Sequence, residues 1–225
     1  GDDDEMDGGA GNDRAFGGDG NDTMRGDEGD DSLYGGSSAD RLYGSSGADL
    51  IYGGSSDDRL YGGTGGGTDT LFGGTGNDKV YGGNQRDKLY GDSGTDSLYG
   101  GVGNDYIYGG SDADKLYGGS GADRIYGGDG DDTFYGGTSA DQLYGGDGAD
   151  HFEFKDNSSN DVIHDYDVSE GDTARIAETS FLNIDVLTDH VDVNHSGGTI
   201  TFEDLQFSNI AEYNAFYASL TIEFL

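Results

Sequence analysis

The chain has 225 residues, of which 46 are Asp or Glu and only 11 are Lys or Arg, so its formal net charge is −35. Gly accounts for 46 residues, hydrophobic residues make up only 32%, and Pro and Cys are absent. This composition excludes an ordinary globular core, disulfide bonds and thiolate metal sites, and it argues against nucleic acid or an anionic membrane as a partner. No apolar run approaches the roughly 20 residues of a membrane span. Because self-repulsion on this scale opposes compaction, we expect a bound cation to be part of the fold.

A nine-residue unit accounts for most of the chain and is represented by Gly73–Tyr81, which reads GGTGNDKVY. Sixteen consecutive units run from Gly8 to Glu153, and only Gly62–Phe72 is longer, by two residues. The pattern is G-G-x-G-x-D-x-U-x, in which U is a large apolar residue. Gly1–Asp7 matches the second part of such a unit, so we expect the array to begin before residue 1. A fixed period of this length predicts a repeat architecture.

The eighth position of the unit is apolar and its neighbours are polar or aromatic, which is the period-two pattern of a short strand. We therefore expect three-residue strands joined by six-residue glycine-rich turns. Two units would complete one coil of an all-β, right-handed parallel β-roll (a β-solenoid) of about eight coils. The sixth-position aspartates would then form two columns, with a carboxylate about every 4.8 Å, so that Asp13 faces Asp31. Carboxylate and backbone carbonyl oxygens, without nitrogen or sulfur, form a donor set typical of calcium.

The tandem GGxGxDxUx pattern resembles the RTX (repeats-in-toxin, hemolysin-type) calcium-binding β-roll of bacterial proteins exported by type I secretion. The resemblance covers Asp4 to about Glu153 and implies multiple Ca2+ ions, on the order of 14, each shared by turns one coil apart. Asp161 is in register as one more Asp-x-U and is expected to complete the last ion site. The metal ligands implied by the resemblance are Asp4, Asp13, Asp22, Asp31, Asp40, Asp49, Asp58, Asp69, Asp78, Asp87, Asp96, Asp105, Asp114, Asp123, Asp132, Asp141, Asp150 and Asp161.

Some units depart from the pattern where glycine would supply a left-handed backbone. The fourth position is Ser38, Ser56, Gln85, Asp112 or Ser139 in five units, and the second position is Asp27, Ser45 or Asp92 in three. A left-handed conformation costs a non-glycine residue roughly 1–2 kcal/mol. We therefore expect weaker or missing ions near Ser38, Ser56, Gln85 and Asp112, and a distorted site at the insertion around Gly65–Thr68.

The ninth position is aromatic in most units, and we expect ladders of stacked rings on the outside of both sheets. These residues are Tyr34, Tyr43, Tyr52, Tyr61, Phe72, Tyr81, Tyr90, Tyr99, Tyr108, Tyr117, Tyr126, Tyr135 and Tyr144. Seven basic residues share the seventh position, namely Arg14, Arg41, Arg59, Lys79, Lys88, Lys115 and Arg124. This Tyr/Lys/Arg face is either a binding surface for a polysaccharide or cell-surface ligand, or a device that stiffens a thin core and offsets the negative field.

The glycine rhythm stops after Glu153, so we divide the chain into a repeat β-roll at 1–153 and a C-terminal capping region at 154–225. Phe154–Ile176 alternates apolar and polar residues and resembles the segment that closes the β-roll in RTX proteins. Thr199–Asp204 predicts a strand, and Asn209–Tyr217 predicts a short helix. The terminal Thr221–Leu225, reading TIEFL, resembles an uncleaved type I secretion signal. No nucleophile elbow or paired-carboxylate motif indicates a catalytic site, so we do not expect an enzyme.

These patterns and the resemblance lead to one functional hypothesis. The chain is a calcium-binding RTX module that is unfolded at low calcium and folds on binding extracellular calcium. It would serve the secretion and folding of a larger bacterial protein that passes through the type I secretion apparatus and is secreted, extracellular or at the cell surface. Two alternatives stay open. One is an adhesin or polysaccharide-binding module that uses the Tyr/Lys/Arg face, and the other is the carrier domain of a secreted protease, lipase or epimerase.

Overall fold

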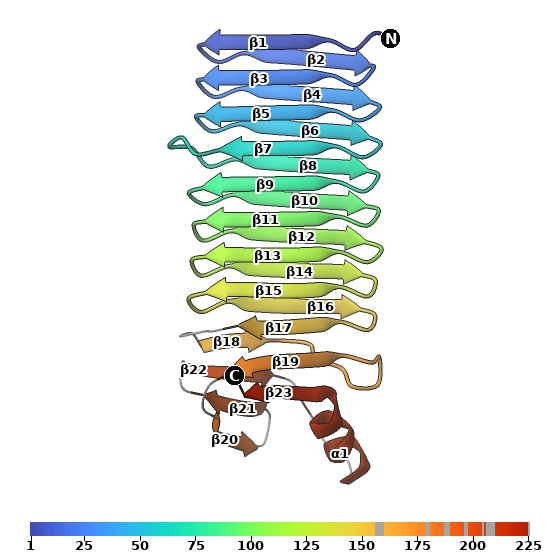
Figure 1. The fold of residues 1–225 in the computed structure, drawn as a ribbon, viewed down its shortest axis with the longest axis vertical. Helices are drawn as coiled ribbons and strands as arrows, with labels where there is room; N and C mark the ends of the chain where they lie inside the picture. Colours follow the sequence, from blue (N-terminus) through green and yellow to red (C-terminus); the bar gives the residue numbers. More distant parts are fainter. Residues whose placement is uncertain are drawn as a thin grey trace.

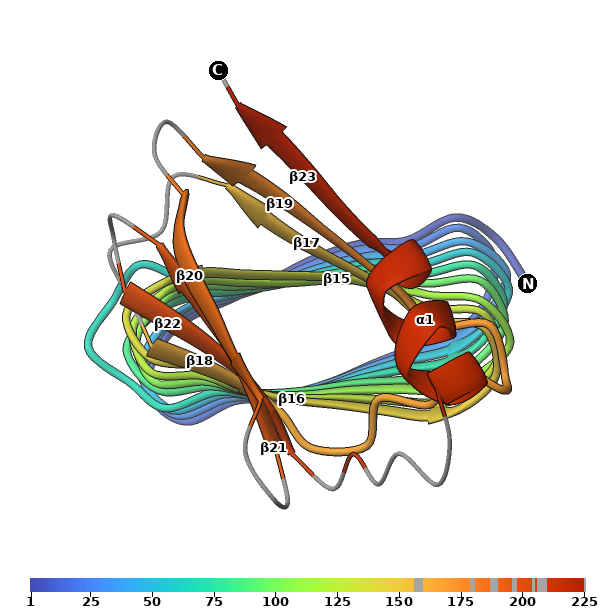
Figure 2. The same ribbon diagram turned by 90° about the horizontal axis from the view of Figure 1, so that it is seen from below.

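The computed structural model describes residues 1–155, 160–178, 181–186, 190–195, 198–203, 205 and 210–224. The chain winds into a long parallel β-solenoid whose successive coils are stacked along one axis (Figure 1). Seen along that axis, the coils overlay as a flattened ring whose two long sides are the two sheets (Figure 2). The β-roll that the nine-residue period predicts is therefore confirmed.

Odd- and even-numbered strands of the repeat form opposite sheets, because one unit crosses each side of the coil. The first sheet contains, in spatial order, β1 (Glu5–Ala10), β3 (Thr23–Glu28), β5 (Arg41–Ser46), β7 (Arg59–Gly63), β9 (Lys79–Asn84), β11 (Ser97–Val102), β13 (Lys115–Ser120), β15 (Thr133–Thr138), β17 (His151–Lys155), β19 (Thr173–Glu178) and β23 (Leu220–Phe224). The second sheet contains β2 (Arg14–Asp19), β4 (Ser32–Ser37), β6 (Leu50–Ser55), β8 (Thr70–Thr75), β10 (Lys88–Ser93), β12 (Tyr106–Ser111), β14 (Arg124–Asp129), β16 (Gln142–Asp147), β18 (Asn160–Ile163), β22 (Gly198–Glu203), β21 (His190–His195) and β20 (Phe181–Val186). Pairing is parallel except where β21 meets β20 and β22.

The repeat strands are longer than the sequence pattern predicts. Strand β9 reads KVYGGN, and its pairing with β11 continues from Lys79↔Ser97 through Asn84↔Val102. Most strands thus have six residues and leave only three for the turn, so the prediction of three-residue strands and six-residue turns was wrong. Parallel pairing uses backbone N–H and C=O groups, which glycine supplies as well as any other residue. The identical neighbouring coil offers a partner to each of them.

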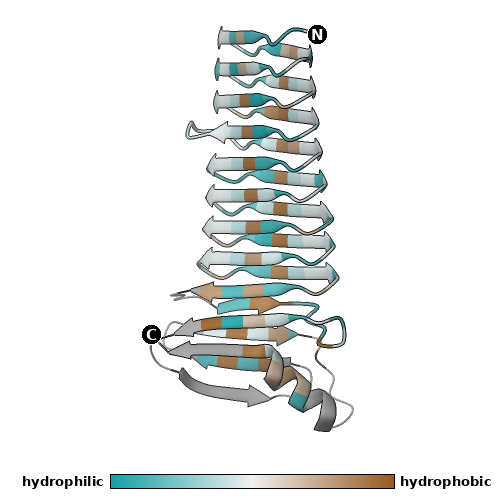
Figure 3. Cartoon of the chain, turned by 45° about the vertical axis from the view of Figure 1, so that its right-hand side comes forward, coloured by the Kyte–Doolittle hydropathy of each residue, from teal (hydrophilic) through white to brown (hydrophobic). Residues whose placement is uncertain are grey.

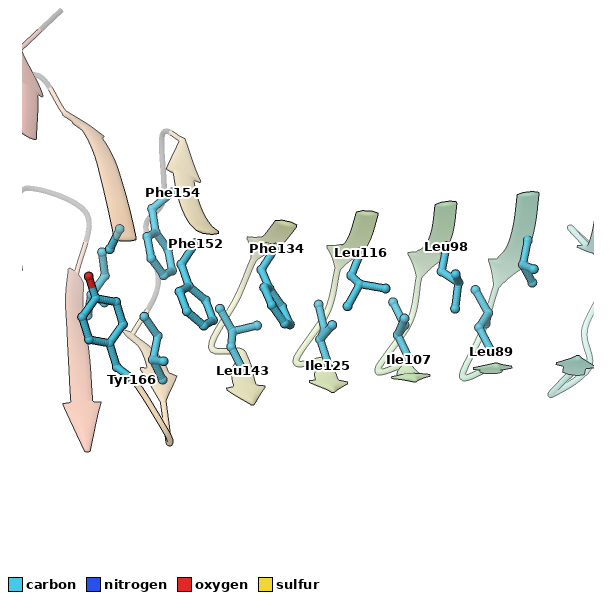
Figure 4. Packing of buried hydrophobic residues seen from close by; sticks show 14 of the residues in the cluster. Leu89, Leu98, Ile107, Leu116, Ile125, Phe134, Leu143, Phe152, Phe154 and Tyr166 are labelled. Carbon is cyan, nitrogen blue, oxygen red and sulfur yellow. The ribbon is translucent and has the colours of Figure 1, made fainter. Parts of the chain in front are cut away.

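The core is one column of apolar side chains from each sheet, pointing inward from the eighth position. Leu89, Leu98, Ile107 and Leu116 are all 0% exposed. Figure 4 shows these side chains alternating between the two sheets along the axis. Figure 3 shows the same arrangement as a narrow apolar band along the middle of the strands, flanked by polar and glycine-rich surface. Such a thin core provides little hydrophobic stabilisation per residue, so other interactions must contribute to the stability of the fold.

The backbone confirms the left-handed positions predicted from the irregular units. Among the described residues, the non-glycine residues with positive φ are Asp27, Ser38, Ser45, Ser56, Gln85, Asp92, Asp112 and Ser139, with φ from 72° to 85°. These are the same eight positions at which the unit lacks its second or fourth glycine. The two-residue insertion projects as a loop between β7 and β8 (Figure 1), while Leu50↔Thr70 pairing keeps the register beyond it. The insertion therefore leaves the stacking of the coils intact.

The C-terminal strands continue both sheets and end them differently. β17, β19 and β23 extend the first sheet in parallel, whereas β22, β21 and β20 close the second with antiparallel pairing. Tyr166, Phe202 and Phe216 meet edge to face, with ring centroids 5.0 to 5.8 Å apart, and close the end of the core. β22 matches the predicted strand at Thr199–Asp204, and helix α1 (Ile210–Ser219) matches the predicted helix at Asn209–Tyr217. Asp204, Asn209 and Leu225 lie outside the described residues.

The part of the chain that the structure describes has no helix with the length and apolar character needed to cross a membrane.

Candidate calcium-binding columns

Most sixth-position aspartates are the last residue of a three-residue turn and directly precede a strand, whereas Asp69 ends the longer turn of the insertion and Asp161 lies within β18. Asp78, for example, ends the turn Gly76-Asn77-Asp78 before β9. From Asp22 to Asp150 every aspartate of this set is 0 to 3% exposed, and Asp161 is 0% exposed. The repeat therefore buries fifteen carboxylates at the turns between Asp22 and Asp150 in a chain that has few cations to pair with them.

One oxygen of each carboxylate is held by the backbone of the preceding coil. The N–H of Asp78 donates to Asp96 Oδ1 at 2.7 Å, and the N–H of Asp96 donates to Asp114 Oδ1 at 2.7 Å. The same bond recurs at 2.7 to 3.0 Å along both edges of the roll. One column contains Asp4, Asp22, Asp40, Asp58, Asp78, Asp96, Asp114, Asp132, Asp150 and Asp172, and the other contains Asp13, Asp31, Asp49, Asp69, Asp87, Asp105, Asp123, Asp141 and Asp161. The two predicted columns, and the facing of Asp13 and Asp31, are present.

The second oxygen of most of these carboxylates is buried without a partner. Among the described residues, Oδ2 makes no hydrogen bond in Asp13, Asp22, Asp31, Asp40, Asp49, Asp58, Asp78, Asp87, Asp96, Asp105, Asp114, Asp123, Asp132, Asp141 and Asp150. Leaving a buried polar atom unsatisfied costs about 1–3 kcal/mol, and more for a charged group. Fifteen such atoms in regular rows indicate that a ligand belongs beside them.

Backbone carbonyls face the same space as these unpartnered oxygens. A Cβ added to Gly82 would lie 2.7 Å from Asp87 Oδ2 and 2.7 Å from the carbonyl oxygen of Gly100, one coil further on. The first glycine of the unit is therefore needed to leave this oxygen-lined space open. The described residues contain no group of three or more His, Cys, Asp or Glu side chains placed so that they could hold a metal ion by themselves. A metal at these turns would thus combine carboxylate and carbonyl oxygens, which is the donor set that fits calcium.

From Asp40 to Asp150, burial raises the pKa of the sixth-position turn carboxyls above the usual value for aspartate. Desolvation is the largest cause, and it raises the pKa of Asp78 to about 6, of Asp87 to about 7 and of Asp96 to about 8. Neighbouring aspartates of the same column add a smaller rise at Asp87 and Asp96, while the backbone N–H bond opposes it. Without a cation the folded columns therefore disfavour the ionised form, and a divalent cation would reverse that preference.

Five segments of the chain, residues 1–33, 34–66, 64–98, 90–125 and 117–152, match the family described as RTX calcium-binding nonapeptide repeat. The chain belongs to this RTX family. Its repeats therefore form a structural module that binds calcium, as the sequence pattern predicts. No curated protein sequence matches the RTX chain. The solved structures similar to it include the crystal structure of extracellular lipase LipA from Serratia marcescens, at 15% identity and a TM-score of 0.41; the similarity covers 95% of this chain and 39% of the lipase chain.

Two aspartates that the sequence analysis did not select lie at the C-terminal end of the RTX columns. Asp172 accepts the N–H of Asp150 on Oδ1 at 2.9 Å and the N–H of Asp167 on Oδ2 at 2.7 Å. Asp165 accepts the N–H groups of Gly145 and Gly146 at 2.7 and 3.1 Å. Both carboxylates are therefore occupied by backbone donors, of which Gly145, Gly146 and Asp150 belong to the last regular coil and Asp167 to the segment after it. The Gly-Asp pair before a strand was the available signal for Asp172, but its offset of 22 residues from Asp150 concealed the register.

The ninth-position side chains form two ladders of stacked rings. In the first sheet the ladder runs from Tyr43 to Tyr135, and in the second sheet it runs from Phe16 to Tyr144 and ends on His164. Between repeat aromatics the ring centroids are 4.5 to 5.1 Å apart and the planes differ by at most 12°. The predicted ladders are therefore confirmed. Since each ring covers the face of the next, the ladders present ring edges and hydroxyl groups, not free faces, to a ligand.

Proposed function

We propose that the eighteen sixth-position aspartates named from the sequence, Asp4 to Asp161, are the side-chain ligands of calcium in this RTX module. The observation that carries the proposal is the row of fifteen buried Oδ2 atoms that lack a hydrogen-bond partner within the described part of the chain. Most of them lie beside a carbonyl oxygen from the next coil, as Asp87 does beside Gly100. Ions shared between adjacent turns, on the order of 14 in all, would satisfy these atoms and neutralise the columns.

We further propose that calcium binding drives folding. Without calcium, the roll must bury unpartnered carboxyls around a core that is only one side chain thick, and the chain has a formal net charge of −35. The unfolded, hydrated chain is then the favoured state. When calcium binds only the folded form, its binding free energy becomes folding free energy. Extracellular calcium at millimolar concentration is sufficient for sites with dissociation constants of roughly 10⁻⁴–10⁻³ M.

This switch suits a chain that must leave a cell before it folds. The proposed parent is a larger bacterial protein that passes unfolded through the type I secretion apparatus and is secreted, extracellular or at the cell surface. Residues 1–153 would form the calcium-dependent roll. Residues 154–225 would cap it and carry the export signal, since β17 to β23 cover both sheets at that end. The parent could carry a protease, lipase, epimerase or adhesive activity elsewhere, and the module would serve each in the same way.

The test is a far-UV circular dichroism titration of the chelator-treated chain with calcium, and with magnesium as the control ion. We expect a steep coil-to-β transition between about 0.1 and 5 mM calcium that magnesium does not produce. Asp96→Asn removes one charged oxygen from a column, whereas Asp129→Asn removes the same charge from an exposed residue at the end of β14. Only Asp96→Asn should raise the calcium requirement. A full β spectrum in excess chelator, or equal effects of the two substitutions, would contradict the proposal.

A further inference from the structure

Tyr106 on β12 interrupts the regular outer face of the second sheet. It is the only Tyr or Phe at the seventh position of a unit, where the chain otherwise places small, basic or other non-aromatic residues. Two arginines lie over its ring. The guanidinium carbon of Arg86 is 4.7 Å from the ring centroid, and that of Arg124 is 5.6 Å from it. The register also pairs Lys88 of β10 with Tyr106, so a third cationic residue occupies the neighbouring strand position.

These two arginines are not used to neutralise the protein's own carboxylates. Within the described ranges, neither Arg86 nor Arg124 has an ion pair with an acidic side chain, although the chain carries 46 acidic residues. Arg124 is oriented by two neutral acceptors, because its Nη1 donates to Tyr106 Oη at 3.2 Å and its Nε donates to Gln142 Oε1 at 3.0 Å. A guanidinium has five N–H donors, so most donors of the pair stay available.

A hollow of about 240 Å³ lies beside this cluster. Exposed Ala122 and Ala140 in the adjacent turns leave it room, and Asn104 and Gln142 contribute side-chain amides. The oxygen of each amide is already engaged: Asn104 Oδ1 accepts the N–H of Ala122 at 2.9 Å, and Gln142 Oε1 accepts from Arg124. The NH2 groups of both amides are then left as donors. The rim of the hollow therefore presents N–H donors together with a ring edge and two methyl groups.

We propose that this hollow, the Arg86–Tyr106–Arg124 site, binds the oxyanion group of an acidic sugar, either a carboxylate or a sulfate. Planar guanidinium groups match such oxyanions with paired hydrogen bonds. The volume exceeds what a single carboxylate needs, and the apolar surface of Ala122, Ala140 and the Tyr106 ring edge suits the C–H surface of a sugar ring. The other donors suit ring hydroxyls. An aromatic ring face is not required, which distinguishes this site from the self-stacked ladders.

Two turn aspartates set a condition for binding. Asp105 and Asp123 also line the hollow, and both belong to the proposed calcium columns. An anionic ligand would be repelled by their ionised carboxylates, so the site should work when calcium neutralises them. This condition rests on the proposed function, and the test is therefore made on protein that circular dichroism shows to be folded in calcium. A folded protein that binds no sugar would overturn the site and leave the calcium proposal intact.

The experiment is NMR titration of the calcium-loaded chain, following the arginine Nε–Hε signals, with glucuronate, glucose 6-sulfate, glucose and acetate as separate probes. We expect saturable shifts of the Arg86 and Arg124 signals with glucuronate or glucose 6-sulfate, and the stronger binder identifies the oxyanion. Glucose and acetate should bind about tenfold more weakly or worse, since each lacks half of the recognised groups.

Matched variants distinguish binding at this site from attraction by the overall electrostatic field of the protein. Arg86→Gln/Arg124→Gln should weaken the preferred sugar acid at least about tenfold. Arg41→Gln/Arg59→Gln removes the same charge from the first sheet and should change the affinity less than twofold. Tyr106→Ser, which installs the residue found at the equivalent Ser97, should also weaken binding because it frees the arginines to move. Equal losses in the two arginine pairs, equal binding of glucose, or no saturable shift would each overturn the inference.

Discussion

The open space beside the first glycine of each unit can be tested by adding a single methyl group. Gly82→Ala would place a Cβ 2.7 Å from Asp87 Oδ2, 2.7 Å from the Gly100 carbonyl oxygen and 3.0 Å from Asp87 Cβ. The carbonyl oxygen belongs to a strand that is hydrogen-bonded to the next coil, so moving it would cost backbone hydrogen bonds. The φ angle of Gly82 is not in the left-handed region, so the substitution acts through space and not through backbone preference.

Two costs add in the Gly82→Ala protein. Overpacking of a tight site costs about 1–3 kcal/mol. If the methyl group also expels one ion, the protein loses about 1.4–2.7 kcal/mol at about 10 mM calcium, for a dissociation constant of about 10⁻⁴–10⁻³ M. The sum of about 2–6 kcal/mol would be spread over roughly 14 coupled ions, so the calcium midpoint would shift only about twofold or less. Urea unfolding at fixed calcium is therefore the better assay, and we expect a midpoint lower by roughly 1–2 M.

Gly66→Ala is the matched control. A Cβ at Gly66 meets no atom within 4 Å, and Gly66 has no left-handed φ. Its free energy of unfolding should stay within about 0.5 kcal/mol of that of the unmodified chain. The explanation based on an oxygen-lined space fails if Gly82→Ala unfolds together with Gly66→Ala at the same urea concentration and retains the same number of bound calcium ions.

Three further predictions concern pH, the ladders and the cap. Burial raises the folded pKa of Asp96 and Asp141 to about 8, above the unfolded value of 3.8. These groups therefore favour the metal-free fold most strongly below about pH 4, and that contribution is lost as pH rises from about 4 to about 8. The chelated chain should therefore gain β structure on acidification, as far-UV circular dichroism would show, and a coil spectrum at pH 4 would refute this. Tyr99→Ala removes stacks of 4.7 and 4.6 Å and should lower the free energy of unfolding in calcium by about 1–3 kcal/mol, whereas an unchanged urea midpoint would deny the ladder a stabilising role. Deleting residues 154–225 should raise the calcium concentration needed for folding, because the ends of both sheets lose their partners, and an unchanged titration would argue against a capping role.

The sequence was informative wherever a side chain had to recur at a fixed interval. The nine-residue period predicted the parallel register, both aspartate columns and the aromatic ladders, and the missing glycines predicted all eight left-handed residues. Asp161 could be placed because Asp161-Val162-Ile163 keeps the local Asp-x-U spacing, and the structure holds Asp161 Oδ1 3.0 Å from the N–H of Asp141. Contacts made by side chains that recur at a fixed position of the repeat can therefore be predicted from the sequence.

Features that depend on the backbone or on irregular spacing were not predictable in the same way. The glycines after each aromatic residue resemble turn sequence, yet they pair as strand because the adjacent coil supplies backbone partners. Asp165 and Asp172 cap the last coil through N–H groups, an interaction that follows from three-dimensional proximity and leaves no periodic trace. β22 begins at Gly198, as the glycine pair at positions 197 and 198 indicates, whereas no local pattern predicts that β19 and β20 belong to different sheets.

The bonds from aspartate N–H groups to carboxylates give the roll two chemically different ends, like those of a polar filament. Along the sixth-position columns the backbone N–H points to a carboxylate of the following coil, as from Asp78 to Asp96, whereas some fifth-position N–H groups point back to the preceding coil, as from Ala48 to Asp30 Oδ1. When a coil is added on the N-terminal side, the N–H of its sixth-position aspartate finds a carboxylate acceptor already in place on the folded roll. When a coil is added on the C-terminal side, its carboxylate accepts an N–H of the folded roll, but the N–H of its own sixth-position aspartate has no partner. Pulsed hydrogen exchange after calcium addition would reveal this as protection that spreads from the Asp161 end toward Asp4. Ends that differ in this way add coils at different rates, so we expect the chain to fold coil by coil from its C-terminal end toward its N-terminal end.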